Sequence, residues 1–380
     1  MRTKWLASLV AGLLLGISGV AQQEPIKIGV VQALTGPLSL NGIDGLRGAQ
    51  MAVLSINRAG GVLGRPLELV VEDNKGEVAA AIAAAERMAY VHKVPVVIET
   101  NFSFLINAVH EVYWQAAIPF VCAGTSPVLT QYGNPYLFRI RHNDKLTALA
   151  AVKHAVENMG AKRLAIVHVI DDFGHGARDA LIGAMRSLYG IEPVAVVGLP
   201  LDIKDATGPV MEIVTANPDV IFVWAHAAQG ALFFRSRYEL GYTNIPVIGS
   251  VVVAAPATIE LAGKEALEGC MFVGDFALDA PKVSLFNNWY YELYGETVLS
   301  EVGMAVYDAV CLVAKAIEKA GTVDPQAIRD ALVGIEMEGV LRTYFVRPDG
   351  ETAFELTIGQ IKNGKSSFVS LVKFPRDIKF

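Results

Sequence analysis

The sequence has few cysteines and none of the spacings typical of a metal site. Its three cysteines, Cys122, Cys270 and Cys311, lie too far apart for a zinc motif. We interpret Cys122, inside an apolar run, as a core residue, and the sequence leaves a Cys270–Cys311 disulfide open. The G-x-S-x-G and H-E-x-x-H patterns are also absent. These absences argue against a hydrolase or metalloenzyme, and we expect no cofactor and no metal.

The chain has only one long apolar run, at its start, and no second run that could cross a membrane. Residues 1–21 read as a signal peptide, with Arg2 and Lys4 at the positive end and the small residues Gly19, Val20 and Ala21 at the cleavage site. No cysteine follows that site, which argues against a lipid anchor. We therefore expect the mature protein outside the cytoplasm.

The sequence also has fewer basic residues than acidic ones, 32 against 38. The net charge of −6 becomes −8 when the signal peptide, with its two basic residues and no acid, is removed. Such a balance argues against nucleic acid and anionic membranes as partners. With 8% aromatic residues and no low-complexity tract, the remaining chain of about 360 residues is long enough for two globular domains.

What the sequence does contain is a regular alternation of strands and helices in two successive blocks. In the first block we expect strands over 26–33, 67–72, 94–99 and 119–123, and helices over 45–58, 78–90 and 103–117. In the second block we expect helices over 146–159, 176–189, 209–216 and 230–240, and strands over 163–169, 193–198, 220–224 and 246–251. A segment over 270–276, a helix over 302–320 and antiparallel strands from Glu336 onward follow. This order predicts two parallel α/β sheets with a ligand cleft at the carboxyl ends of their strands.

Residues 359–366 fit the phosphate-loop pattern G-x-x-x-x-G-K-[ST]. That loop must open a helix, whereas the residues that follow here are β-branched and aromatic. Asn363-Gly364 between two apolar runs is typical of a hairpin turn. We therefore expect a hairpin and no nucleotide site.

Two short segments follow neighbouring strands of the first block. Asn101-Phe102-Ser103 follows one strand and opens a helix, and Ala123-Gly124-Thr125 follows the next. A helix N-terminus, two hydroxyls and a glycine that lets backbone approach closely form an uncharged cradle for a carboxylate. The plainer alternative is that Ser103 only caps its helix.

The other polar candidates are less specific. His168, His175 and His226 are dispersed, and we interpret each as a hydrogen-bonded structural residue. We interpret Asp171-Asp172 as part of a solvated loop that follows a strand.

At these residues the chain resembles the type I periplasmic solute-binding proteins of branched-chain amino acid ABC transporters, the leucine/isoleucine/valine-binding group. The resemblance covers nearly all of the mature chain and rests on an ordered set of motifs. These are residues 26–30 with 34–37, 57–66 with 72–73, 125–130, 136–139 and 172–176.

The resemblance implies an α/β fold of two doubly wound lobes joined by a three-crossing hinge. Lobe 1 would comprise 26–144 plus 275–342, and lobe 2 would comprise 145–274 plus 343–380. It implies a periplasmic monomer without enzymatic activity. The protein would close over a small carboxylate ligand and then dock on a membrane permease.

The resemblance also implies the binding positions. Ser103, Ala123 and Thr125, with Gly124 between them, match positions that bind the α-carboxylate and part of the amine. The remaining pocket residues would be Asn41, Phe102, Phe173, Trp224, His226, Val251 and Val302.

Two departures bear on the ligand. Val251 stands where amino-acid binders usually place an acid, and Phe173 replaces a usual tyrosine. A buried ammonium without a counter-charge is costly. We therefore expect a carboxylate ligand without an α-amine, preferably an aromatic acid such as a benzoate or cinnamate. The alternative ligand is an amino acid, whose ammonium Glu99 or Asp275 would bind. The alternative classes of protein, which we rank lower, are a ligand-sensing domain and a hydrolase.

Overall fold

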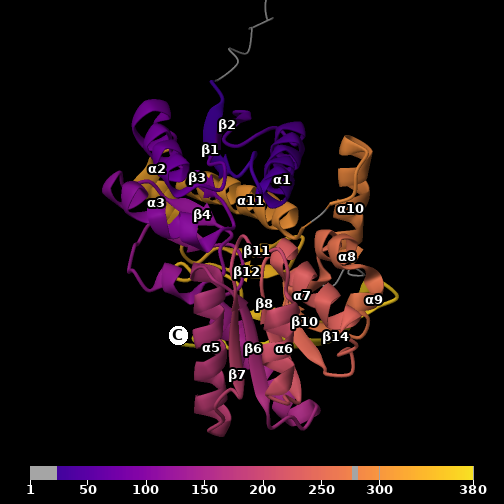
Figure 1. Cartoon of the computed structure of the whole chain (residues 1–380). Helices are drawn as coiled ribbons and strands as arrows, with labels where there is room; N and C mark the ends of the chain where they lie inside the picture. The colour runs from indigo at the N-terminus through magenta and orange to yellow at the C-terminus, as the bar shows by residue number, and fades with distance from the viewer. Residues whose placement is uncertain (1–23, 276–280, 299, 380) are drawn as a thin grey trace, which may run out of the picture.

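The computed structural model describes residues 24–275, 281–298 and 300–379. The predicted signal peptide, 1–21, and Phe276 at the end of the segment expected over 270–276 lie outside the described residues. The chain forms two lobes, each built on its own sheet, and Figure 1 shows them one above the other.

The first sheet has five parallel strands in the order β2-β1-β3-β4-β5. They are β1 (Ile26–Gln32), β2 (Leu67–Asp73), β3 (Val97–Glu99), β4 (Phe120–Cys122) and β5 (Leu137–Arg139). Helices α1 (Ser39–Arg58) and α11 (Val302–Ala320) pack together on one face, and α2 (Val78–Glu86) and α3 (Ser103–Gln115) on the other. Because both faces are covered, the strands read as nearly continuous apolar runs.

The second sheet has seven strands in the order β14-β13-β10-β9-β8-β6-β7. The parallel strands are β6 (Leu164–Val169), β7 (Ala195–Leu199), β8 (Val220–Trp224), β9 (Val247–Ser250) and β10 (Met271–Gly274). The antiparallel pair β13 (Glu355–Lys362) and β14 (Lys365–Lys373) extends it at one edge. Its helices are α4 (Asp144–Lys153), α5 (Asp172–Tyr189), α6 (Thr207–Thr215), α7 (Ala227–Glu239), α8 (Pro256–Ala262) and α9 (Lys264–Leu267).

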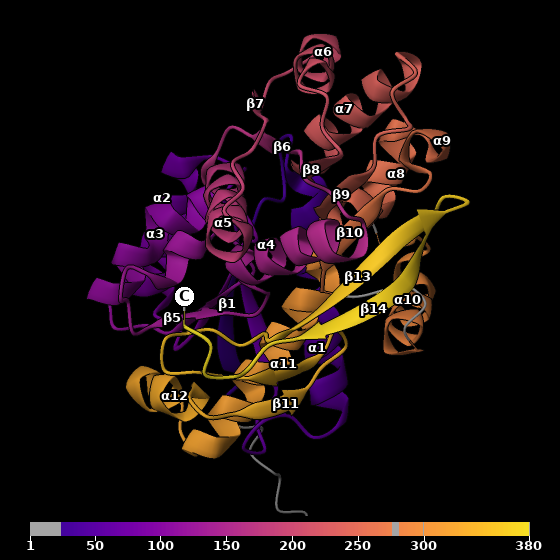
Figure 2. The same cartoon turned by 90° about the horizontal axis from the view of Figure 1, so that it is seen from below.

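The chain passes between the lobes after β5, after β10 and before β13, as Figure 2 helps to follow. The last helices and the small second pair of strands lie on the first-lobe side. They are α10 (Pro281–Tyr294), α12 (Pro325–Leu332), β11 (Glu336–Glu338) and β12 (Thr343–Phe345). The lobe boundaries given above stay a prediction.

The first helix begins earlier than the sequence predicts, at Ser39 and not at residue 45. The added turn contains Gly42, and the helix continues through Gly48. A side chain at either position would lie 1.9 Å from a backbone oxygen, of Ala33 and of Gly303 respectively. Glycine is a poor helix former, but here close packing requires it.

Two further expectations have clear outcomes. Residues 359–366 form the antiparallel hairpin between β13 and β14, with positive φ at Asn363 and Gly364, so the hairpin prediction is confirmed. All three cysteines are free thiols, so the Cys270–Cys311 disulfide left open above does not form.

Candidate functional site

A cavity of about 610 Å3 lies where the carboxyl ends of the two sheets face each other. Segments that follow β1, β3, β4 and β5 form one side, and segments that follow β6, β7, β8 and β9 form the other. Both lobes therefore contribute to one chamber, in the place that the strand order predicts.

The structure divides the predicted site residues into two groups. The first group lines the cavity and consists of Asn41, Phe102, Thr125, Phe173, His226 and Val251. The second group is buried behind the wall and consists of Ser103, Ala123, Gly124, Trp224 and Val302. Their roles in binding stay a prediction.

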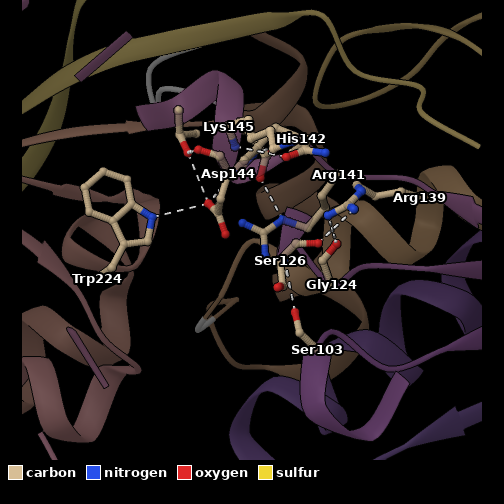
Figure 3. Close-up of polar contacts among 12 residues, drawn as sticks. Ser103, Gly124, Ser126, Arg139, Arg141, His142, Asp144, Lys145 and Trp224 are labelled. Carbon is tan, nitrogen blue, oxygen red and sulfur yellow. Dashed lines mark hydrogen bonds and ion pairs between the residues drawn. The ribbon is translucent and has the colours of Figure 1, made fainter. Parts of the chain in front are cut away.

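Ser103 is the first residue of α3, and it does not cap that helix; Phe102 precedes it in the capping position without a side-chain bond. The plainer alternative, in which Ser103 only caps its helix, is therefore not observed. The Ser103 hydroxyl instead accepts a hydrogen bond from the Ser126 amide at 3.2 Å (Figure 3). A side chain at Gly124 would lie 2.5 Å from Ile106 and 3.0 Å from the Ser103 oxygen. Gly124 thus lets the loop after β4 lie directly against α3.

Three rings form one wall of the cavity. Phe173 stacks on His226 with ring centres 5.2 Å apart, and the edge of Phe102 meets the same imidazole at 5.7 Å. His226 Nε2 lies 2.7 Å from Asp171 Oδ2, so this nitrogen is occupied. Burial alone raises the pKa of Asp171, but the hydrogen bond with His226 and the Gly174 amide bring it below its usual range. Asp171 is therefore a buried helix cap and partner of His226, and the expectation of a solvated loop is wrong for it.

The hinge holds a cluster of charged side chains, of which the sequence analysis singled out only Asp275. Arg141 lies 2.7 Å from Asp275 and 3.0 Å from Glu301, and Arg342 also pairs with Asp275. Burial raises the pKa of Asp275, but His142 and the two arginines outweigh it and hold the pKa well below the usual range. The positive charges of the two arginines thus balance the negative charges of Asp275 and Glu301.

Asp144, the first residue of α4, is the remaining carboxylate of this cluster (Figure 3). It lines the cavity, and its Oδ1 accepts bonds from Trp224 Nε1 at 3.2 Å and Thr147 Oγ1 at 3.1 Å. Its Oδ2 is buried and has no hydrogen-bond partner among the described residues. The nearest basic group is His142, whose Nε2 is 3.8 Å from Oδ1. Burial raises the pKa of Asp144, and its neighbours offset only part of that rise.

Asp144 is also adjacent to the loop that follows β4. Its amide donates to the Thr125 carbonyl at 3.0 Å, and the Thr125 hydroxyl helps to lower its pKa. Neither Glu99 nor Asp275 lines the cavity; Glu99 accepts a bond from the Tyr113 hydroxyl at 2.7 Å. The signal that could have found Asp144 is the same one that found Thr125, namely its place just after a parallel strand.

Known proteins share this sequence pattern and this fold. Residues 25–366 match the family model described as periplasmic binding protein. The chain belongs to this family. It is 27% identical over 329 residues to "Leu/Ile/Val-binding protein homolog 3" of Brucella melitensis, with 86% of this chain and 88% of the relative covered.

Solved structures show the same fold. The chain matches the branched-chain amino acid transporter substrate-binding protein LivJ of Streptococcus pneumoniae, solved with isoleucine, at a TM-score of 0.83 and 25% identity. That match covers 92% of this chain and 99% of the other. A binding protein of Rhodopseudomonas palustris HaA2 in complex with p-hydroxybenzoic acid gives a TM-score of 0.83 at 22% identity, covering 92% and 97%, and shows the fold alone.

The protein is therefore a non-enzymatic solute-binding protein of an ABC transporter, with two parallel-sheet α/β lobes of the type I periplasmic binding fold. In the part of the chain that the structure describes, no helix has the length and apolarity needed to cross a bilayer. Within the same residues, no group of three or more potential ligands is placed to hold a metal ion.

Proposed function

We propose that this protein captures an α-amino acid with an apolar side chain and delivers it to the permease of an importer. The observation that carries the proposal is the carboxylate of Asp144, which is buried in the cavity wall next to Thr125 and whose Oδ2 has no hydrogen-bond partner among the described residues. An α-amino acid carries its carboxylate and its ammonium on one carbon, so it needs an anion site and a cation site side by side.

The anion site would be the uncharged end of the cavity. Thr125 lines it, the Thr125 amide has no acceptor among the described residues, and Ser103 supports the same loop from α3. Neutral donors at the end of a helix bind a carboxylate without bringing a cation into the cleft. This part of the proposal is common to every carboxylate ligand.

The cation site would be Asp144. The argument for an amine-free ligand assumed that an apolar Val251 leaves the cavity without an acid. Val251 does line the cavity, but Asp144 supplies a carboxylate from the start of α4, where the chain has just crossed between the lobes. A buried charge without a partner is unfavourable, so a ligand ammonium at this position would be strongly favoured.

The side chain of the ligand would contact apolar residues of the second lobe, among them Val251, Val252 and Leu232. The relatives fit this class, since the Brucella protein is named a Leu/Ile/Val-binding homolog and the Streptococcus protein was solved with isoleucine. Binding and release occur without chemistry, by hinge closure of the two lobes over the ligand. Asn107 of the first lobe already donates to Asp172 of the second at 3.0 Å, which would help to hold the closed form.

A thermal-shift screen of the purified mature protein tests the proposal. Leucine, isoleucine, valine and phenylalanine are compared with 2-hydroxyisocaproate, benzoate and cinnamate. A true ligand at about 100 times its dissociation constant stabilises the fold by roughly 2.7 kcal/mol. We expect the amino acids to raise the melting temperature; a response to the amine-free acids alone would refute the proposal.

A second candidate is an aromatic acid without an amine. It is favoured by the ring wall of Phe102, Phe173 and His226, since flat rings suit an aromatic ligand. It brings no cation to Asp144 and places a second anion beside it. We therefore rank it below the amino acid.

A further inference from the structure

Arg139, the last residue of β5, is fully buried behind the loop that carries Thr125. Its Nη1 donates to the Gly124 carbonyl at 3.0 Å, and its Nη2 donates to the Ser126 carbonyl at 2.9 Å (Figure 3). One guanidinium therefore holds two backbone carbonyls on either side of Thr125. Arg139 does not line the cavity, so it acts on the loop from behind.

Because the peptide bond is planar, the hydrogen bond to the Gly124 carbonyl also fixes the direction of the Thr125 amide. In a trans peptide the carbonyl of one residue and the amide of the next point to opposite sides. With the Gly124 carbonyl fixed on Arg139, the Thr125 amide must point away from the guanidinium. This amide has no hydrogen-bond acceptor among the described residues, and Thr125 lines the cavity.

The charge of Arg139 is balanced on its far side. Its Nε lies 3.4 Å from Glu351, which comes from the chain crossing before β13 and is itself fully buried. Glu351 also accepts bonds from Asn143 and Thr130, both at 2.7 Å. The charge of Arg139 is therefore paired with a buried carboxylate, while its two Nη groups hold the loop.

We propose that Arg139 is the positioning residue of the carboxylate site: it holds the loop so that the Thr125 amide and hydroxyl face the ligand. This inference rests on the proposed function only in requiring a carboxylate ligand, with or without an amine. This role requires the two fixed Nη donors of a guanidinium, because a lysine cannot bond two carbonyls in fixed directions.

The test compares Arg139→Met and Arg139→Lys with wild type, using the best ligand of the thermal-shift screen and its carboxamide. Calorimetry gives both dissociation constants. We expect Arg139→Met to weaken the acid about 10- to 100-fold, as loss of well-aligned bonds to a charged group does, and the amide far less. Arg139→Lys should keep the fold but restore little of the affinity. Glu351→Gln is the matched control, because it removes the ion pair and leaves both carbonyl bonds.

A second readout keeps the test independent of folding losses. In an amide NMR spectrum, the Thr125 resonance should shift when ligand binds to wild type, and this shift should be lost in Arg139→Lys. Equal losses for the acid and the amide, or no loss for either, would overturn the positioning role. If wild type binds only amine-free acids, the proposed function fails, and the same acid–amide comparison still decides the role of Arg139.

Discussion

Replacing Asp144 by asparagine tests the assignment of the ammonium site most directly. Asparagine has the same shape and keeps an oxygen for the Trp224 indole and the Thr147 hydroxyl, so only the negative charge is removed. Two unit charges about 4 Å apart attract by about 4 kcal/mol at an effective dielectric constant of about 20. Loss of one partner of a buried pair typically costs about 3–5 kcal/mol. We therefore expect an amino acid to bind at least about 100-fold more weakly.

The variant should not lose stability when it is free of ligand. Burial raises the pKa of Asp144, which means that its charged form is unfavourable in the empty site. Removing that charge should leave the free energy of unfolding of the empty protein unchanged or higher. Urea unfolding without ligand thus separates a binding defect from a folding defect.

Calorimetry with two ligands completes the design. L-leucine and 2-hydroxyisocaproate differ at the α-substituent, so their affinities in wild type and Asp144→Asn form a double-mutant cycle. Only leucine should lose affinity in the variant. Glu301→Gln is the matched control, because Glu301 lines the same cavity but is already paired with Arg141. Equal losses of both ligands in Asp144→Asn, or unchanged leucine binding, would refute the assignment.

Three further predictions concern stability, the anion site and closure. Glu99 is fully buried and its pKa is raised by burial from an ordinary 4.5 to about 7. Its neutral form therefore stabilises the fold below pH 4.5, and this contribution of roughly 3 kcal/mol is lost as pH rises through 7. Urea unfolding should show that Glu99→Gln lacks this loss; a parallel pH profile for both proteins would contradict it. Gly124→Ala should lower the free energy of unfolding by about 1–3 kcal/mol, because the new methyl would lie 2.5 Å from Ile106, and should weaken ligand binding measured by calorimetry. Asn107→Ala removes the bond to Asp172 across the lobes, so stopped-flow release of ligand should quicken about 3- to 10-fold; unchanged release would exclude this bond as a closure contact.

Regular elements could be predicted from the sequence where local pattern and packing agree. The helix over 302–320 and the strand over 220–224 are observed with the predicted bounds. The strand expected over 94–99 shortens to Val97–Glu99, after Pro95, which has no amide to donate to a neighbouring strand. The start of α1 was missed because Gly42 is a poor helix former, and only the structure shows the close approach to the Ala33 carbonyl that requires it.

The site was predictable to the extent that it depends on position along a strand. Thr125 and Phe102 follow parallel strands, and the structure places both on the cavity. The same signal could mark Asp144 as a candidate, but it could not rank Asp144 above the other acids. Asp144 and Asp275 are both acids near strand ends, but only the structure reveals that Asp275 pairs with two arginines behind the wall, while Asp144 lines the cavity with an Oδ2 that has no hydrogen bond to any described residue.

The buried carboxylate of Asp144 also makes the two candidate ligand classes differ in the sign of their pH dependence. An ammonium favours the charged form of Asp144, so amino-acid binding lowers its raised pKa and releases protons when the carboxyl is partly protonated. An amine-free carboxylate brings a second anion, so its binding favours the protonated form and takes up protons. Affinity should therefore fall with decreasing pH for an amino acid and rise with decreasing pH for an aromatic acid. Calorimetry in buffers of different ionisation enthalpy measures the sign of this exchange. Proton uptake with leucine would contradict an ammonium at Asp144, and Asp144→Asn should abolish the exchange for either ligand.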